Sequence, residues 1–91
     1  MRNGCYTDEL GTREWYLNNK LHRVNGPAVE RADGTRAWFL NNKLHRVDGP
    51  AIEYADGSCE WWLNDQEYDF DTWLKKVDIS QDQKILIRLE Y

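Results

Sequence analysis

Apolar and polar residues alternate in short runs over most of the chain. Three runs, EWYLN, AWFLN and EWWLN, place Trp15, Trp38 and Trp61 at equivalent positions among aliphatic and aromatic neighbours. Alternation with aromatic residues favours β-strands over helices. The pattern therefore predicts three equivalent strands, separated by segments rich in Asn, Gly, Pro and Asp.

These strands belong to a repeat with a period of 23 residues. Residues 11–33 (GTREWYLNNKLHRVNGPAVERAD) align without a gap on residues 34–56 (GTRAWFLNNKLHRVDGPAIEYAD). A third copy begins at Gly57 and degenerates after Asn64, and the earlier stretch GCYTDEL fits the tail of a worn copy that is one residue short. A fixed period of this kind indicates stacked copies of one supersecondary unit.

Each repeat contains residues that favour two tight turns and one strand end. Asn41-Asn42 suits a two-residue turn with positive φ at both positions, and Asp33-Gly34 is a stronger signal of the same turn. Gly49-Pro50 ends the intervening strand, because proline cannot donate to a β-ladder. Each period is therefore predicted to be a hairpin, and residues 4–68 to form an antiparallel β-meander.

The predicted turns fix a register between neighbouring strands. With Asp33-Gly34 as turn residues, Val29 lies opposite Trp38, and with Asn41-Asn42 as turn residues, Trp38 lies opposite His45. One face then carries Val29, Trp38, Leu40 and His45, and the other carries Ala28, Ala37, Phe39 and Leu44. Both faces are partly apolar, so we expect the sheet to curl or to be covered on its second side.

The spacing of apolar residues changes near the C-terminus. A helical stripe at i, i+3, i+4 and i+7 is formed by Phe70, Trp73, Leu74 and Val77. Asp69 or Asp71 is available as its N-cap, and residues 80–83 (SQDQ) read as a capping box that opens a second helix. A strand is the alternative for residues 84–91, where apolar residues also alternate. We expect two short helices within residues 69–91, closing one end of the sheet or covering one face.

Length and charge add limits to this mainly β architecture. The chain has 91 residues, which suits a single domain over residues 1–91. Residues 1–47 carry +3 (eight basic and five acidic residues) and residues 48–91 carry −7 (four basic and eleven acidic), which makes the array an electric dipole. The sequence shows neither a bilayer-spanning run nor a signal peptide, so we expect a cytoplasmic protein. Cys5 and Cys59 are expected to be reduced, partly buried thiols.

The pattern W-x-x-N-x-K-x-H, followed by G and then A-D-G at this period, resembles the MORN repeat. It is more similar to a variant from small bacterial and bacteriophage proteins, with a Trp, then N-G-K-x-H-R-x-x-G-P-A, then A-D-G. The resemblance covers residues 4–68. It departs at Asn19 and Asn42, where the variant has Gly, and at residues 65–68, which lack the His-Arg pair. It implies an elongated hairpin sheet that serves as a binding scaffold. It also implies an inhibitor of a host defence or toxin protein, acting in the host cytoplasm if a phage encodes it.

The duplicated pairs His22-Arg23 and His45-Arg46 are the first candidates for chemistry. A catalytic base needs a nucleophile within reach, but the sequence places no Ser, Thr or Cys beside either histidine. A metal site needs a third ligand, and none accompanies them. We therefore expect each histidine to pack beside the Trp of its own repeat and to bond to backbone. We assign no catalytic, metal or cofactor-binding residue, and we expect a protein that is not an enzyme.

An acidic and aromatic segment, NDQEYDFDTW, is the second candidate. One interpretation is a solvated loop and helix start; the other is an interface that approaches a basic groove on a protein partner, with aromatic anchors and a charged rim. The candidate partner-binding residues are Asp65, Glu67, Asp69, Asp71, Tyr68 and Trp62. The aromatic residues Tyr16, Phe39 and Trp62 are similarly either core beneath the helices or an exposed binding stripe.

The preferred hypothesis is a non-enzymatic protein-binding module that acts through this acidic and aromatic surface. One alternative is an architectural protein whose free strand edges pair into homodimers or longer assemblies. Another is a lipid-surface binder through the basic half. Direct binding to nucleic acid is disfavoured, because the net charge is negative and the acidic end would repel phosphates. A membrane partner is not expected.

Overall fold

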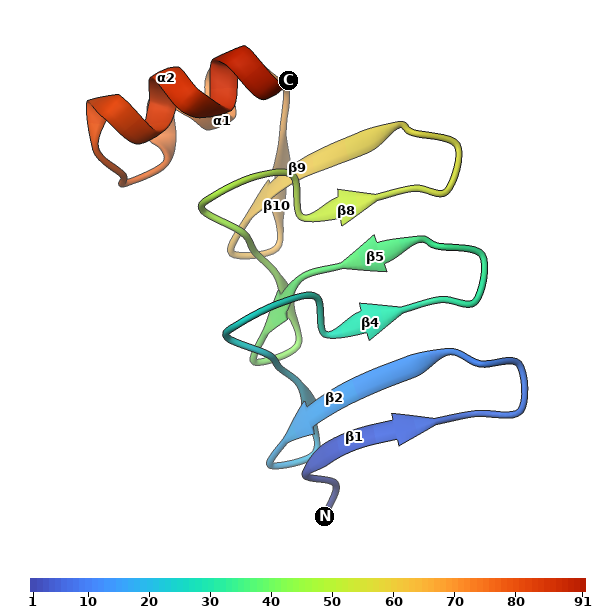
Figure 1. Ribbon diagram of the computed structural model, residues 1–91. Helices are drawn as coiled ribbons and strands as arrows, with labels where there is room; N and C mark the ends of the chain where they lie inside the picture. The colour runs from blue at the N-terminus through green and yellow to red at the C-terminus, as the bar shows by residue number, and fades with distance from the viewer.

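All strands in the structure, a computed structural model of residues 1–91, pair in an antiparallel fashion (Figure 1). They are β1 (Gly4–Thr7), β2 (Arg13–Leu17), β3 (Lys20–Leu21), β4 (Val29–Glu30), β5 (Arg36–Ala37), β6 (Phe39–Leu40), β7 (Lys43–Leu44), β8 (Ile52–Glu53), β9 (Cys59–Leu63) and β10 (Gln66–Tyr68). The main sheet has the order β1-β2-β4-β5-β8-β9-β10, β3 pairs with β2, and β6 pairs with β7. Because the strand order follows the chain, the predicted hairpin meander is confirmed.

The Asn-Asn turns form as predicted. Asn41 and Asn42 have φ values of 51° and 66°, and Phe39 pairs with Leu44 across them. This left-handed region is one that Asn tolerates better than most residues, and two such residues in a row build the turn that matches strand twist. The same geometry closes the short hairpins β2–β3 and β9–β10.

The Asp-Gly turns are one residue longer than predicted. Val29 pairs with Ala37 rather than with Trp38. The N–H of Arg31 donates to the carbonyl of Thr35, which leaves three residues in the loop, and Gly34 has a φ of 97°. A three-residue loop with its glycine in the left-handed region adds a bulge, which moves the register by one residue.

This shift makes part of the predicted face assignment wrong. Val29 lies on the same face as Ala37 and Phe39, because the three side chains line one cavity. Trp38 and His45 lie together on the opposite face, beside Leu40, as expected. A one-residue slip reverses the faces of a strand, which is why the error falls on Val29 and its neighbour alone.

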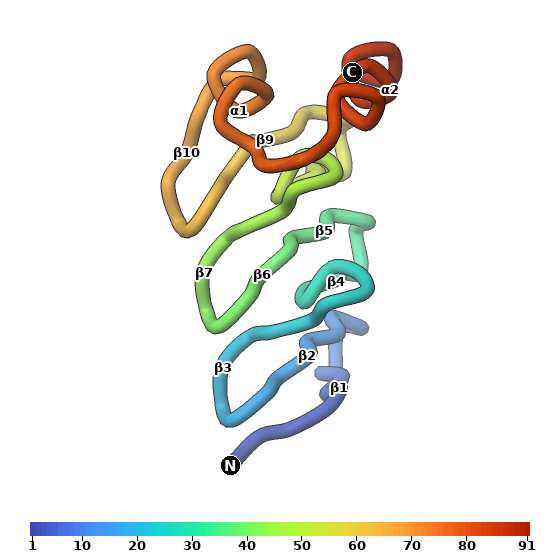
Figure 2. Tube along the Cα trace, turned by 90° about the vertical axis from the view of Figure 1, so that its left-hand side faces the viewer, coloured from blue at the N-terminus to red at the C-terminus, as the bar shows by residue number.

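Each complete repeat bends at its tryptophan. Trp38 lies between β5 and β6; its N–H donates to the carbonyl of Ala51, and its own carbonyl accepts from the N–H of His45. The chain thus leaves the long hairpins of the main sheet and enters a short hairpin. Figure 2 shows the short hairpins (β2–β3, β6–β7, β9–β10) stacked in one row and β4 and β5 in another. The expected curl of the sheet is this bend, repeated along the array.

Two helices, α1 (Phe70–Lys76) and α2 (Gln81–Glu90), lie at the end of the array formed by β9 and β10 (Figure 1). Asp69 caps α1, and Ser80 forms the predicted capping box with Gln83 at the start of α2. The helical interpretation of residues 84–91 is therefore confirmed up to Glu90, and the strand alternative is wrong. The buried core joins the helices to β9 and consists of Trp61, Trp73, Leu74, Val77 and Ile87.

Candidate functional site

Both histidines link one repeat to the next. Nδ1 of His22 accepts the backbone N–H of Asn41 at 3.0 Å, and Nδ1 of His45 accepts the backbone N–H of Asn64 at 3.0 Å. Burial lowers the pKa of His45, which favours the neutral ring that an acceptor nitrogen requires. The imidazoles are therefore part of the stacking contact between consecutive repeats.

The worn first copy keeps this contact with a different residue. Oδ1 of Asn3 accepts the backbone N–H of Asn18 at 2.8 Å. Asn18 is the counterpart of Asn41 and Asn64 at the 23-residue period. Asn3 thus takes the histidine's place, so the contact needs an acceptor and not an imidazole. Sequence alignment misses Asn3, because the recognisable part of the worn copy starts at Gly4.

The arginines of the repeated motif are held within their own repeats. The guanidinium carbon of Arg46 lies 3.7 Å from the ring centroid of Trp38, and its Nη1 donates to Pro50 O at 3.0 Å and to Glu53 Oε2 at 3.1 Å. A Cβ on Gly49 would lie 2.7 Å from this guanidinium, so glycine leaves the space that the arginine fills. Arg23 repeats the arrangement in the first repeat. The residue that stacks on the tryptophan is therefore the arginine rather than the histidine.

The remaining candidates for site chemistry lie apart from one another. The structure contains no group of three or more His, Cys, Asp or Glu side chains that could hold a metal ion. Cys59 is half-buried and free, as expected, whereas Cys5 is exposed, which corrects the expectation of two partly buried thiols. Burial, helped by the charge of Glu53, raises the pKa of the Cys59 thiol. A raised thiol pKa lowers the thiolate fraction and with it the nucleophilicity of the sulfur.

The structure divides the acidic segment among different roles. Asp65 lies in the turn of the third repeat with a φ of 69°, and its Oδ1 accepts the N–H of Leu44 at 3.3 Å. Asp69 caps α1, and hydrogen bonds from Thr72 lower the pKa of its carboxyl. Asp71 lies in the first turn of α1, with Oδ1 3.9 Å from a guanidinium nitrogen of α2. Asp65 and Asp69 therefore support the fold. The capping role of Asp69 is one of the two predicted from the sequence, whereas the role of Asp65 is not.

The two aromatic members of the candidate interface face opposite sides of the sheet. Tyr68 pairs with Trp61 and packs against the core beneath the helices. Trp62 pairs with Glu67, and its Nε1–H donates to Glu60 at 3.0 Å. Because successive side chains of a strand alternate between faces, the predicted set separates into two groups. Trp62 and Glu67 lie together on one face, away from Tyr68 and the helices.

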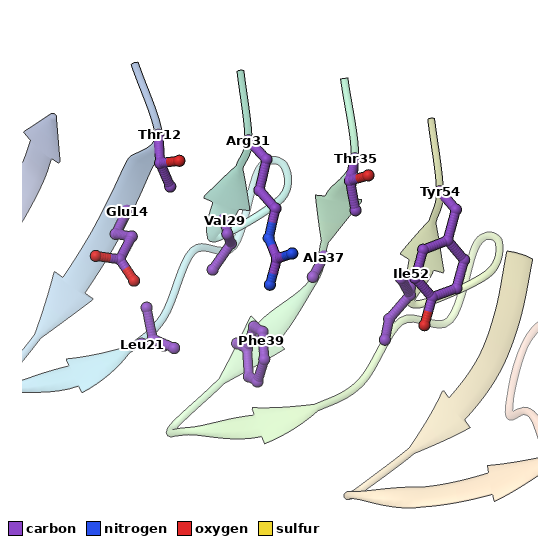
Figure 3. Close-up of a pocket in the computed structure, with 10 residues that line it drawn as sticks. All are labelled: Thr12, Glu14, Leu21, Val29, Arg31, Thr35, Ala37, Phe39, Ile52 and Tyr54. Carbon is purple, nitrogen blue, oxygen red and sulfur yellow. The ribbon is translucent and has the colours of Figure 1, made fainter. Parts of the chain in front are cut away.

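A groove lies on the face that carries Trp62 and Glu67. Its hollowed part is a cavity of about 360 Å³ in the angle between the long and the short hairpins. Glu60, Trp62 and Glu67 continue the same face beyond this cavity without lining it. Figure 3 shows side chains from both rows pointing into this angle. The apolar part of the lining consists of Leu21, Val29, Ala37, Phe39 and Ile52, with the partly exposed ring of Tyr54 beside them.

The stripe of Tyr16, Phe39 and Trp62 belongs to this face. All three are half-buried, and none is part of the cluster formed with the helices. The interpretation of the stripe as core beneath the helices is therefore wrong. α1 and α2 pack on the opposite face of the third repeat, and the stripe is left uncovered along the groove.

Acidic side chains lie at both ends of the groove. Glu14 lines it at β2, and Arg31 is the one basic residue of its lining. At β9 and β10, Glu60 and Glu67 lie on the same face as Trp62. Burial and the neighbouring carboxylate of Glu60 raise the pKa of the Tyr54 hydroxyl, with a smaller effect from the charge of Glu67. The section of the groove formed by the third repeat is therefore acidic and aromatic.

The opposite face pairs much of the basic charge of the first half. Arg13 and Arg36 lie 2.7 and 2.9 Å from Glu30 and Glu53, and Arg46 shares Glu53 at 3.1 Å. The basic half therefore presents less unpaired positive charge than its composition indicates. Neither helix is long and apolar enough to cross a membrane.

Comparison with family models, curated proteins and solved structures gives no match to this chain. The assignment of function therefore depends on the geometry. That geometry has an internally bonded His-Arg scaffold on one side and an open apolar groove with acidic ends on the other.

Proposed function

We propose that the protein is a protein-binding module and that the groove is its binding surface. The observation that carries this proposal is where the two complete repeats differ. They differ at five of 23 positions, which are Glu14/Ala37, Tyr16/Phe39, Asn25/Asp48, Val29/Ile52 and Arg31/Tyr54. All but Asn25/Asp48 belong to the groove face. The scaffold side differs at one position, Asn25/Asp48, whereas the other four differences lie on the groove side.

This distribution separates two tasks within each repeat. Identical side chains on the scaffold face suit a contact that every repeat makes with the next, such as the His45 bond to Asn64. Different side chains along the groove suit a surface that meets an irregular object, because each section of the groove then has its own chemistry. Half-buried apolar groups surrounded by charged ones are also the usual anatomy of a protein interface.

Only two of the six partner-binding residues expected from the sequence are part of this proposal. Trp62 and Glu67 lie at one end of the groove and are retained as contact residues. Tyr68 and Asp71 lie on the helix side, and Asp65 and Asp69 are engaged in the fold. An aromatic anchor beside carboxylates, as at Trp62, suits the edge of such an interface.

The proposal is tested by affinity capture from cell lysate with three immobilised proteins: the natural chain, Phe39→Asp and Lys43→Asp. Phe39 lines the groove, whereas Lys43 is exposed on the other face of the same short hairpin. We expect proteins held by the natural chain to be held by Lys43→Asp and lost by Phe39→Asp. Circular dichroism melting would establish that both variants are folded. Equal capture by folded Phe39→Asp would refute the proposal.

A further inference from the structure

The floor of the groove contains one continuous row of paired residues. Glu14 pairs with Val29, Val29 with Ala37, Ala37 with Ile52, and Ile52 with Glu60. The row crosses β2, β4, β5, β8 and β9 in order, so its members are direct cross-strand neighbours. The order of residues across the sheet is therefore one acidic residue, three apolar residues and one acidic residue.

The length of this row follows from the number of strands that it crosses. Four strand spacings separate β2 from β9, which amounts to about 19 Å. A fully extended chain advances about 3.3 Å per residue, so two of its residues that are six apart span the same distance. Side chains six apart in an extended segment also point to the same side. An extended ligand would thus present both residues to the groove at once.

The charges along the row are complementary to cations at its ends. Glu14 and Glu60 are both half-buried, and Glu67 adds a further carboxylate opposite Trp62 on the same face. Trp62 donates to Glu60 and holds this carboxylate in place, and its ring offers a face on which a cation is stabilised. Arg31, on the lining between the two ends, disfavours a cation in the middle. The groove therefore selects basic groups at the ends and apolar groups between them.

On the basis of the proposed function, we infer that the partner inserts an extended segment with two basic residues six positions apart and apolar residues facing the groove between them. The outer basic residues lie against Glu14 and Glu60. The alternating residues between them lie on the apolar part of the row and against Phe39. A helix would need about 13 residues to cover the same distance, at 1.5 Å per residue, and is about 10 Å wide. The extended form is therefore the better fit to this narrow angle between hairpins.

Three synthetic peptides of equal length test this inference by ¹H–¹⁵N NMR titration of the whole protein. The first, KSLSLSK, has the inferred spacing, with two leucines on the side of the two lysines. The second, ESLSLSE, reverses the end charges, and the third, KKSLSLS, has the first peptide's composition with both lysines at one end. We expect KSLSLSK to shift the amide signals of Val29, Ala37 and Ile52 and the indole signal of Trp62. It should bind about tenfold more tightly than ESLSLSE and more tightly than KKSLSLS.

Matched variants assign the effect to the two carboxylates. The double variant Glu14→Gln and Glu60→Gln keeps the size of both side chains and an acceptor for the Trp62 indole, but removes the two charges. Its affinity for KSLSLSK should fall to that for ESLSLSE. The control double variant Glu9→Gln and Glu90→Gln removes two exposed charges outside the groove and should bind as the natural chain does.

Other outcomes overturn the inference. Equal binding of all three peptides would mean that apolar burial alone determines the affinity. Tighter binding of ESLSLSE would mean that the charge of Arg31 determines which peptide is preferred. If millimolar KSLSLSK causes no shifts in the groove, the basic segment is excluded as the occupant. It is also excluded if the groove shifts depend only on protein concentration, and that result would identify a second copy of the chain as the occupant. The proposed function would survive these results if captured proteins were still lost by Phe39→Asp. It fails separately if that variant captures them unchanged.

Discussion

At the scale of single residues, the repeated histidine acts as a hydrogen-bond acceptor between repeats. His45 and Asn3 make the same contact with the N–H of the next turn, at 3.0 and 2.8 Å. We therefore predict that His45→Asn destabilises the protein less than His45→Leu does. The leucine variant leaves the Asn64 N–H without its partner, at a cost of about 1 kcal/mol for a partly exposed group. Urea unfolding measures both free energies. Equal losses of unfolding free energy in the two variants would show that His45 stabilises the protein by packing of its ring and not by accepting the hydrogen bond.

The lowered pKa of His45 predicts a pH dependence of stability. Because burial holds the folded pKa below its ordinary value of 6.5, the unfolded chain binds the proton more readily. Stability contributed by the neutral ring is therefore complete above about pH 6.5 and is lost as pH falls through the lowered pKa. The urea midpoint should fall between pH 7.5 and pH 5.5, and His45→Asn should reduce the fall. An identical fall in that variant would assign the effect to other groups.

At the scale of elements, the two turn types show how far sequence predicts geometry. Asn41-Asn42 forms the predicted turn because Asn tolerates the positive φ that both turn positions require. At Asp33-Gly34, the Asp33 carboxylate accepts the N–H of Thr35 at 2.9 Å, and the loop takes one more residue than the Asp-Gly pair. This side-chain bond accompanies the shifted register, and residue preferences alone do not reveal it.

The sequence likewise predicts only part of the candidate interface. The alternation of β9 and β10 suffices to place Trp62 and Tyr68 on opposite faces, so their separation could have been predicted. The capping role of Asp69 is likewise one of the two predicted from the sequence. The role of Asp65 could not be predicted, because it depends on which backbone N–H lies beside it in the folded chain. The groove itself depends on the bend at Trp38, which joins residues from two hairpin rows.

The strand at the N-terminal end of the array gives an element-scale prediction. β1 is exposed along its length and pairs only with β2, whereas helices cover the other end of the array. The N–H of Trp15 donates to the carbonyl of Ala28, on the side away from β1. Cys5, which pairs with Trp15, therefore directs its own N–H and C=O outward, and Thr7 does the same two residues later. Unpaired edges of this kind pair with other chains. Pairing of β1 with β1 of a second chain would give a dimer.

Sedimentation velocity over a concentration series measures this association. We expect dimers at high protein concentration for the natural chain, and monomers for Thr7→Pro, which removes an outward N–H without breaking the β1–β2 ladder. A natural chain that stays monomeric throughout would contradict the prediction. The groove lies on a face rather than on this edge, so dimer formation should leave groove binding unchanged.

At the scale of the whole molecule, the scaffold and the proposed binding surface occupy opposite faces of one array. The scaffold face holds the Trp-Arg-Glu contacts and the histidine bonds, identical in the two complete repeats. The groove face holds four of the five positions that differ between them. The resemblance to MORN repeats remains a prediction about ancestry, whereas this division is read from the contacts themselves.

The division is tested most directly by the affinity of one captured partner for two folded variants, His45→Leu and Phe39→Asp. His45→Leu should lower the unfolding midpoint but bind the partner within about twofold of the natural chain, because it affects only the contact between repeats. Phe39→Asp should weaken binding at least about tenfold, because it places a charge in the apolar groove. A His45→Leu variant that is folded but no longer binds, beside a Phe39→Asp variant that binds normally, would contradict the account.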